Sequence, residues 1–307
     1  MDADLDTLAT ALYVTSDDLL KAHPEQLPPR PATGFHPRIT DAELVTLAVI
    51  QALLQIPKER RFLRYAHRHL IDMFPNLPGQ SSYNRRLRAL AGTMAWLTTQ
   101  LASTTSVFTD DLWIVDSTPI ECARSRETVK RSDLAGWAEY GYCASHSRFF
   151  WGLRLHLVAT RHGLPIVWAL SGAKADERDV FEDMLGMLPP HLATAVAADG
   201  QTTMGDKNYF GRQFEQRLNQ GGITVLRPTR AGEKPRPGSE FFKPLRQVIE
   251  SIFDTFKDQL DLERHNARTP TGVLARIATR ILALTTAIWH NDRIGAPVLR
   301  SLTAYDH

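Results

Sequence analysis

The sequence predicts an α/β fold, in which a mixed sheet flanked by helices follows an all-helical N-terminal domain. Apolar residues recur at helical spacing through the first third of the chain. A continuous apolar run at 112–115 then opens a region in which strand-like and helix-like segments alternate. With 307 residues, of which 43% are hydrophobic, the chain is long enough for two packed domains. We expect a helical domain over 1–108 and an α/β domain over 109–307.

Capping and turn signals place four helices in the N-terminal domain. Thr40 and Glu43 form a capping box, in which each side chain can bond a free backbone N–H at the start of a helix. Pro57 suits the first turn of the next helix, where its missing N–H costs nothing. A turn rich in Pro and Gly then precedes a last helix that begins near Ser82. The four expected helices span 5–20, 40–56, 57–74 and 82–101.

Basic residues are concentrated on the third and fourth of these helices. Residues 57–90 contain eight Lys and Arg side chains but only two acidic ones, Glu59 and Asp72. Two helices joined by a turn, the second opening with polar and basic residues, are typical of helix-turn-helix DNA-binding proteins. Solvated helix faces and helical packing domains have similar patterns, so both readings stay open. The candidate DNA contacts here are Arg60, Arg64, Arg85, Arg86 and Arg88.

The second domain is predicted from apolar runs separated by turn signals. The run at 112–115 is a buried strand that ends at Asp116, and a turn at Gly163 joins the two strands of a hairpin. His156 alternates with leucines in that hairpin, so we expect it on the polar, solvent-facing side. The next strand is either 193–199 or 202–206. The other expected elements are hairpin strands at 149–160 and 164–171, a strand at 223–226, and helices near 176–188, 210–218, 243–257 and 271–289.

The order of these elements is compatible with a ribonuclease H-like (RNase H-like) fold, a mixed sheet with helices on its faces. In that architecture the ends of the first and fourth strands and the last helix of the layer meet at one edge, so Asp116, Asp206 and Glu250 would converge. Glu250 borders the apolar stripe of its helix and should therefore be half-buried. Alternatively, Arg246 and Glu250, four residues apart, form an ordinary surface ion pair.

Asp199 is the alternative for the second carboxylate of this cluster. The run at 193–198 is more apolar than the segment that leads to Asp206. Asp206 is nevertheless preferred, because Asp199 followed by Gly200 is typical of a turn.

Three clustered carboxylates would raise one another's pKa unless a cation neutralised them. Mg²⁺ or Mn²⁺ would fit, because such ions bind carboxylate oxygens together with substrate phosphate. Two ions can activate an attacking water or hydroxyl and stabilise the leaving oxygen at phosphorus. Lys207, Arg246 and Lys257 would then hold the DNA backbone near the ions. The sequence contains no phosphate-binding loop or dinucleotide motif, and its two cysteines lack metal-type spacing.

Three motifs resemble those of the DDE insertion-sequence transposases, which belong to the RNase H-like superfamily. The motifs are VDSTPI around Asp116, GDKNYFG around Asp206, and Arg246, Glu250 and Lys257 at spacings of four and seven. Together they are similar to the bacterial insertion-sequence family numbered nine hundred and eighty-two, over essentially the whole chain. Two positions depart from the pattern, because Lys243 stands where a related motif has Tyr and Asn208 where a Gly is expected. Asn tolerates the left-handed backbone that such a Gly would adopt.

The resemblance implies an enzyme that cuts DNA at transposon ends and joins the freed 3′ hydroxyl to target DNA. It implies that Asp116, Asp206 and Glu250 are the catalytic, metal-binding triad. It also implies terminal inverted repeats as partners and a homodimer or larger assembly on DNA. We expect no membrane span and a bacterial cytoplasmic location. The alternatives are a non-catalytic DNA-binding protein and an RNase H-like nuclease without strand transfer.

Overall fold

The computed structural model describes residues 3–30, 37–143, 147–236, 238, 242–298 and 302. The chain forms two compact units. A helical unit combines Met1–Thr105 with Thr255–His307, and an α/β unit comprises Ser106–Asp254. This differs from the expected division at 108, because the residues after Asp254 belong to the helical unit and not to the α/β domain. The reason is that the last helix buries its apolar side chains against the N-terminal helices.

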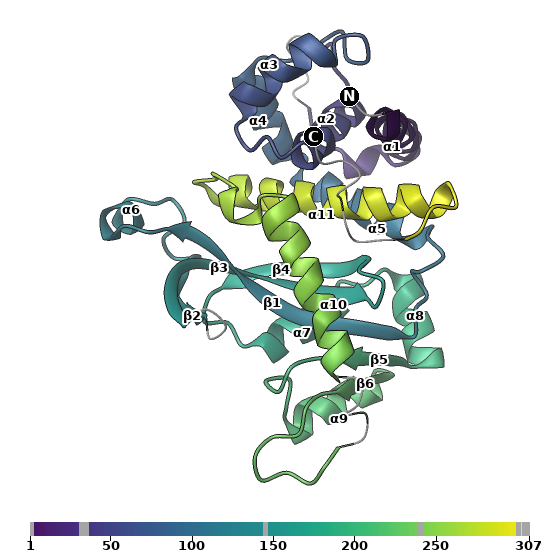
Figure 1. Ribbon diagram of the computed structural model, residues 1–307, viewed down its shortest axis with the longest axis vertical. Coiled ribbons are helices and arrows are strands. Elements are labelled where there is room, and N and C mark those ends of the chain that lie inside the picture. Colours follow the sequence, from purple (N-terminus) through teal and green to yellow (C-terminus); the bar gives the residue numbers. More distant parts are fainter. Residues whose placement is uncertain are drawn as a thin grey trace. The chain divides into compact units, whose positions relative to one another are not determined.

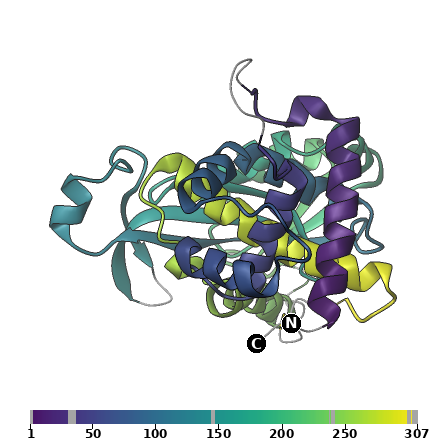
Figure 2. The same cartoon turned by 90° about the horizontal axis from the view of Figure 1, so that it is seen from above.

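The helical unit is built around α11, Pro270–Arg293. This helix packs against α1, α2, α4 and α5, and Figure 2 looks down on the helical unit from above. Although α11 is long and apolar enough to cross a membrane, 83% of its apolar window is buried, as in the core helix of a packed domain. The other elements are α1 (Ala3–Ala22), α2 (Asp41–Leu53), α3 (Glu59–His69), α4 (Gln80–Ala89), α5 (Ala91–Ser103) and short helical turns at Pro24–Gln26, Thr255–Gln259 and Leu262–Arg264.

Local sequence signals explain the boundaries of these helices. At the start of α2, Thr40 Oγ1 accepts from the Glu43 amide at 3.1 Å and Glu43 Oε2 accepts from the Thr40 amide at 2.6 Å, so the predicted capping box is confirmed. The helix predicted over 82–101 is divided at Leu90, which ends α4 and caps α5. Thr269 caps α11, and its Oγ1 accepts from the Gly272 amide at 3.2 Å.

The α/β unit carries a mixed sheet in the order β2-β3-β1-β5-β6, with β4 paired to β3. β1 runs antiparallel to β3 and parallel to β5, and β5 runs parallel to β6. The path β4-β3-β1-β5-β6 thus has an antiparallel half and a parallel half that meet at β1, which confirms the predicted RNase H-like fold class. The strands are β1 (Leu112–Ala123), β2 (Glu139–Cys143), β3 (Arg148–Thr160), β4 (Pro165–Gly172), β5 (Gln201–Met204) and β6 (Ile223–Leu226).

Helices cover this sheet (Figure 1). α7 packs on β3 and β4, α9 packs on β6, and α10 lies across β1. The strand considered at 193–199 is instead part of a helix, because Pro190 starts it and Leu192 and Val196, four residues apart, form its buried side. The helices of this unit are α6 (Arg126–Lys130), α7 (Glu177–Gly186), α8 (Pro190–Asp199), α9 (Arg212–Gln220) and α10 (Phe242–Asp254).

Candidate active site

Asp116 lies within β1, not at its end as the sequence suggested. The parallel pairing with β5 stops at Ile114, which faces Met204, whereas the antiparallel pairing with β3 continues to Ala123. Asp116 therefore emerges where its neighbour β5 has ended, and its side chain is half-buried. The Ser117 amide donates to its Oδ1 at 2.7 Å.

Burial and neighbouring charge make Asp116 an unusual acid. Burial is the main reason that its pKa is raised to about 7. The hydrogen bond from Ser117 lowers the pKa, and the nearby carboxylates of Asp206 and Glu177 raise it further. The Arg154 guanidinium lowers the pKa, so one nearby cation opposes the effect of the two carboxylates.

Asp206 follows β5 by two residues and is held by the loop GDKNYFG. The Asn208 amide donates to Asp206 Oδ1 at 2.7 Å, and Asn208 Nδ2 donates to Oδ2 at 3.0 Å. Asn208 does not adopt a positive φ, so it serves this loop through its side chain and not through a left-handed backbone. The close approach is made at Gly205, where a Cβ would lie 2.7 Å from the Tyr209 ring.

The charged groups around Asp206 have opposite effects on its pKa. Asp206 as a whole residue is exposed, but its carboxyl group is partly buried by neighbouring atoms. This partial burial is the main reason that its pKa is raised. The Asn208 hydrogen bond lowers the pKa and the charge of Glu177 raises it, while Lys207 and Arg246 act as nearby cations that lower it.

Asp199, the alternative second carboxylate, lies at the other end of β5. It is the last residue of α8, is exposed, and is separated from the first residue of the strand by Gly200. Asp206 follows the last residue of the same strand, beside the point where Asp116 emerges from β1. Because β5 separates the two positions, Asp199 is displaced from the cluster by the length of that strand.

Glu177, which no sequence motif marks, is the third acidic side chain of this cluster. It is the first residue of α7, whose N-cap Asp176 accepts from the Arg178 amide. Its Oε1 accepts from Ser117 Oγ at 2.6 Å, and its Oε2 lies 3.5 Å from Asn208 Nδ2. Asn208 therefore connects Glu177 to Asp206, and Ser117 connects it to β1.

Arg154 on β3 is the cation that balances Glu177. Its Nη1 donates to Ser117 Oγ at 2.9 Å and to Glu177 Oε1 at 3.4 Å. Its Nη2 donates to the carbonyl of Tyr142 at 3.2 Å, so one guanidinium connects α7, β1 and β2. The arginine and the glutamate are both mostly covered, which makes the pair stronger than an exposed one.

Tyr209 lies beneath the cluster with its hydroxyl buried. Its ring packs edge-on against Phe181 of α7, with centroids 5.9 Å apart. Within the described part of the chain its Oη has no hydrogen-bond partner. Burial raises its pKa well above the ordinary value, and the charges of the three cluster carboxylates add to this effect. The phenol is therefore neutral.

Glu250 is placed differently from the expectation of a half-buried carboxylate. It stands on α10, 53% of its side chain is exposed, and its Oε1 accepts from Arg246 Nε at 2.8 Å. This is the surface ion pair that the sequence left open as an alternative. Among the described residues, no three His, Cys, Asp or Glu side chains are arranged as a ready metal-binding group. Asp116, Asp206 and Glu177 are thus electrostatically coupled, whereas Glu250 is held by Arg246.

The candidate DNA-binding cations near the cluster have different positions. Lys207 is exposed directly after Asp206, and Arg246 influences Asp206 from α10. Lys257 lies in the helical turn Thr255–Gln259, which belongs to the helical unit.

His156 is buried, contrary to the expectation that it faces solvent. Its side chain shares a sheet face with its pairing partner Ser117, and its Nε2 lies 2.8 Å from Ser171 Oγ. This is the face on which α7 packs, so the polar side of the hairpin is covered. Burial lowers the pKa of His156 to about 4.

This buried imidazole predicts a pH dependence of stability. Between pH 6.5 and about 4 the unfolded chain binds a proton at His156 that the folded chain does not, so the free energy of unfolding should decrease as the pH falls. At pH 5 the loss is about 2 kcal/mol. Urea unfolding of the wild type and of His156→Gln at pH 7 and pH 5 should show a smaller decrease in the variant. Equal decreases would contradict the prediction.

In the helical unit, α3 carries an exposed basic face. Arg60, Arg61, Arg64 and Arg68 are exposed, and none has an ion-pair partner among the residues that the structure describes. At about 100° per residue these four positions fall within one third of the helix circumference. Buried Phe62, Leu63 and Ala66 form the opposite side, so α3 is held by packing and presents its arginines outward.

Two of the three arginines on α4 that were predicted to contact DNA make contacts within the protein instead. Arg86 is mostly buried, and it donates to Asp41 Oδ1 at 2.5 Å and to the carbonyl of Ile39 at 3.0 Å. It therefore neutralises a buried carboxylate and is not available to DNA. Arg88 donates to Thr271 Oγ1 at 2.9 Å, while Arg85 is exposed. The expected DNA-reading role of this second helix is thus weakened, and α3 is the better candidate.

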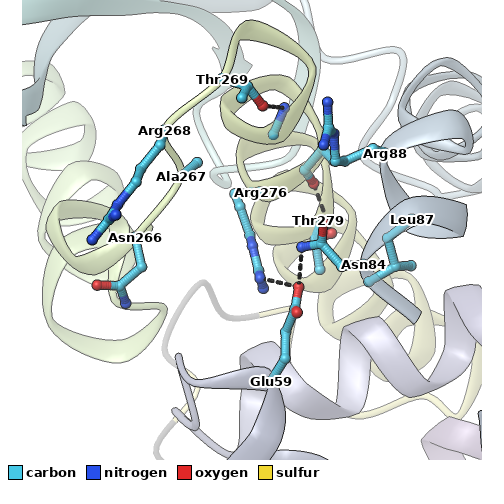
Figure 3. Close-up of a pocket in the computed structure, with 12 residues that line it drawn as sticks. Glu59, Asn84, Leu87, Arg88, Asn266, Ala267, Arg268, Thr269, Arg276 and Thr279 are labelled. Atoms are coloured by element: carbon cyan, nitrogen blue, oxygen red, sulfur yellow. Dashed lines mark hydrogen bonds and ion pairs between the residues drawn. The ribbon is translucent and has the colours of Figure 1, made fainter. Parts of the chain in front are cut away.

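A polar pocket of about 220 Å³ lies between α4 and α11 (Figure 3). At its wall Asn84 Nδ2 donates to Glu59 Oε1 at 2.7 Å, and Arg276 also donates to this oxygen. Gln80 donates to the other oxygen at 3.1 Å. Glu59 is nearly fully buried, so these contacts satisfy a buried charge and hold α3, α4 and α11 together.

An RNase H-like sheet with one aspartate in β1 and a coupled aspartate just after β5 is typical of enzymes that act on nucleic acids. The family model described as "Transposase DDE domain" matches residues 108–286, which is more than half of the 307-residue chain. The chain therefore belongs to the DDE transposase family. No curated protein sequence matches it.

Two solved transposase structures are similar to this chain at low identity. One is the cryo-EM structure of a piggyBac transposase synaptic complex with hairpin DNA, with 8% identity, a TM-score of 0.40, and coverage of 97% of this chain and 81% of that one. The other is the crystal structure of the Mos1 mariner paired end complex with Mn, with 11% identity, a TM-score of 0.26, and coverage of 93% and 97%. The family assignment rests on the sequence match.

Proposed function

We propose that this chain is an active transposase that cuts transposon-end DNA and transfers the 3′ hydroxyl strand to target DNA. The main support is the electrostatic coupling of Asp116 and Asp206, in which the charge of Asp206 raises the pKa of Asp116. Both residues lie where β1 continues past the end of β5. In a member of the DDE transposase family, paired carboxylates at this position are the ones that would act on phosphodiester bonds.

The donor atoms of this site suit Mg²⁺ or Mn²⁺. Asp116 and Asp206 offer hard carboxylate oxygens, whose pKa values are raised mainly by burial and in part by the neighbouring charge of Glu177. A bound cation would favour the charged form of both carboxylates. When bound, two such ions would supply activation of the attacking water or hydroxyl and stabilisation of the leaving oxygen. Asn208 and Ser117 fix the two carboxylates in place, so little reorganisation is needed at this pair.

Glu250 is proposed as the third ligand, as the family resemblance implies. Its helix α10 packs on β1, the strand of Asp116. Its bond to Arg246 is an exposed pair four residues apart, and such pairs contribute only a few tenths of a kcal/mol. A metal ion could therefore draw Glu250 away at little cost, and the released Arg246 would be free to contact a DNA phosphate with Lys207.

We propose that α3 holds duplex DNA through the phosphates that its four exposed arginines can neutralise. Transfer of both transposon ends requires two active sites, so the active form on DNA would be at least a homodimer. The bacterial cytoplasm is the proposed location, and the transposon's terminal inverted repeats are the proposed DNA partner.

The exposure of Glu250 favours one alternative, a DNA-binding protein that acts by occupancy alone. A titration of Mg²⁺ in a reaction with labelled terminal-repeat DNA separates the readings. A transposase should give nicked product and a joined product that depend on Mg²⁺ and disappear with EDTA. An occupancy protein would give neither product at any Mg²⁺ concentration, and a nuclease without strand transfer would give only the nick.

A further inference from the structure

The β2–β3 hairpin carries exposed aromatic side chains that the cluster chemistry does not use. Tyr140, Tyr142 and Phe149, here called the aromatic surface, have 51%, 48% and 78% of their area exposed. Tyr142 pairs across the strands with Phe149, and their ring centroids are 5.0 Å apart. Tyr140 lies two residues from Tyr142 and hence on the same face. Neighbouring large aromatic side chains exposed on one face are typical of an interaction site.

The chain segment that precedes β2 is rich in cations, which favours a polyanion as the ligand. The segment that connects β1 to β2 has four cations against one acid between residues 124 and 131. Arg126 and Arg131 are exposed and have no ion-pair partner among the described residues. An apolar protein surface would gain little from these charges, whereas a nucleic-acid backbone would. Aromatic rings beside cations are the usual composition of surfaces that bind unpaired bases.

The aromatic surface is connected to the acid cluster by a single side chain. The carbonyl of Tyr142 accepts from Arg154 Nη2 at 3.2 Å. The same guanidinium reaches Ser117 and Glu177 through Nη1, at 2.9 and 3.4 Å. Ser117 directly follows Asp116 in β1. The backbone of Tyr142 is therefore only one guanidinium away from the residue that follows Asp116, which places β2 beside the acid cluster.

We propose that the aromatic surface stacks the unpaired bases of the DNA strand that is cut at the acid cluster. This inference rests on the proposed function, because it places the scissile phosphate at Asp116 and Asp206. The rings would hold the nucleotides that flank the break once they leave the duplex, and the cations would hold their phosphates. Stacking does not depend on base identity, since every base has an aromatic face.

Binding of the full-length protein to two DNAs, measured without divalent metal, tests the inference. One DNA is a blunt duplex, and the other is the same duplex with a four-nucleotide single-stranded tail that contains 2-aminopurine. Phe149→Ala and Tyr142→Ala should each weaken binding of the tailed DNA about 10-fold and reduce quenching of the 2-aminopurine. Their affinity for the blunt duplex should not change.

Two control variants make this result specific. Met187→Ala removes an exposed apolar side chain elsewhere in the α/β unit and should bind both DNAs normally. Phe149→Trp keeps a stacking ring and should bind the tailed DNA like the wild type. Unchanged binding of the tailed DNA would overturn the inference, as would alanine variants that lose self-association in sedimentation with no change in DNA affinity. Because no cleavage is measured, failure of the proposed function would appear only in the separate Mg²⁺ titration.

Discussion

Asp116→Asn should abolish DNA cleavage, with a rate decrease of about 1000-fold or more, the upper range seen when one electrostatically stabilising group is removed. The physical reason is the position of Asp116, a half-buried carboxylate that is coupled to both Asp206 and Glu177. Asn keeps the shape and removes the charge that a metal ion would need. The measurement is the single-turnover rate of nicking on terminal-repeat DNA at saturating Mg²⁺.

Stability and DNA binding serve as controls for this variant. Ionisation of Asp116 is disfavoured in the metal-free protein, since burial raises its pKa to about 7. The variant should therefore be at least as stable as the wild type at pH 8, and its affinity for DNA should be retained. Cleavage at the wild-type rate would contradict the assignment, and lost cleavage together with a lower Tm would point to a structural role instead.

Replacing the four exposed arginines of α3 should have the second largest effect. These residues are Arg60, Arg61, Arg64 and Arg68. Each phosphate contact contributes about 0.9 to the dependence of log affinity on log salt concentration, so changing all four to Ala should lower this slope by up to about 3.6. Affinity for duplex DNA should decrease about 100-fold or more at low salt. Fluorescence anisotropy at several salt concentrations measures both quantities.

The loss of two cations elsewhere in the same unit controls for nonspecific electrostatics. Arg264 and Arg293 are exposed cations of the helical unit outside α3, and their joint replacement with Ala should leave the slope nearly unchanged. The four α3 positions are exposed, so the Tm should not change. An unaltered slope in the α3 variant would show that DNA is held elsewhere.

Local sequence patterns predict much of the fold. Whether a given face is buried, however, depends on which neighbouring element packs against it. The apolar run at 112–115 is part of a buried strand because β3 and β5 flank it. The run at 193–199 is also largely apolar, but it consists mainly of Ala, and Pro190 together with the four-residue spacing of Leu192 and Val196 makes it helical. His156 alternates like a solvent-facing residue, but α7 covers that face of the sheet. The alternation of polar and apolar residues along a strand does not by itself reveal which face of the sheet a helix covers.

The candidate site could be predicted only where a motif marks it. Asp116 and Asp206 were found from their motifs, and the structure couples them. No local motif marks Glu177, because an acidic residue is ordinary in the first turn of a helix such as α7. Only the packing of α7 on the sheet brings Glu177 to Ser117. The sequence predicts Arg86 as a DNA contact, but in the structure Arg86 pairs with Asp41, which lies 45 residues earlier in the chain. Such long-range pairings cannot be read from a single sequence.

Binding of Mn²⁺ to the metal-free protein, followed by the electron paramagnetic resonance signal of the free ion, tests the central proposal most directly. The wild type should bind Mn²⁺, and Asp116→Asn, Asp206→Asn and Glu250→Gln should each weaken binding at least about 10-fold. Glu177→Gln serves as a comparison, because Glu177 adjoins the aspartates without belonging to the proposed triad. Wild-type Mn²⁺ affinity in Asp116→Asn or Asp206→Asn would contradict the account.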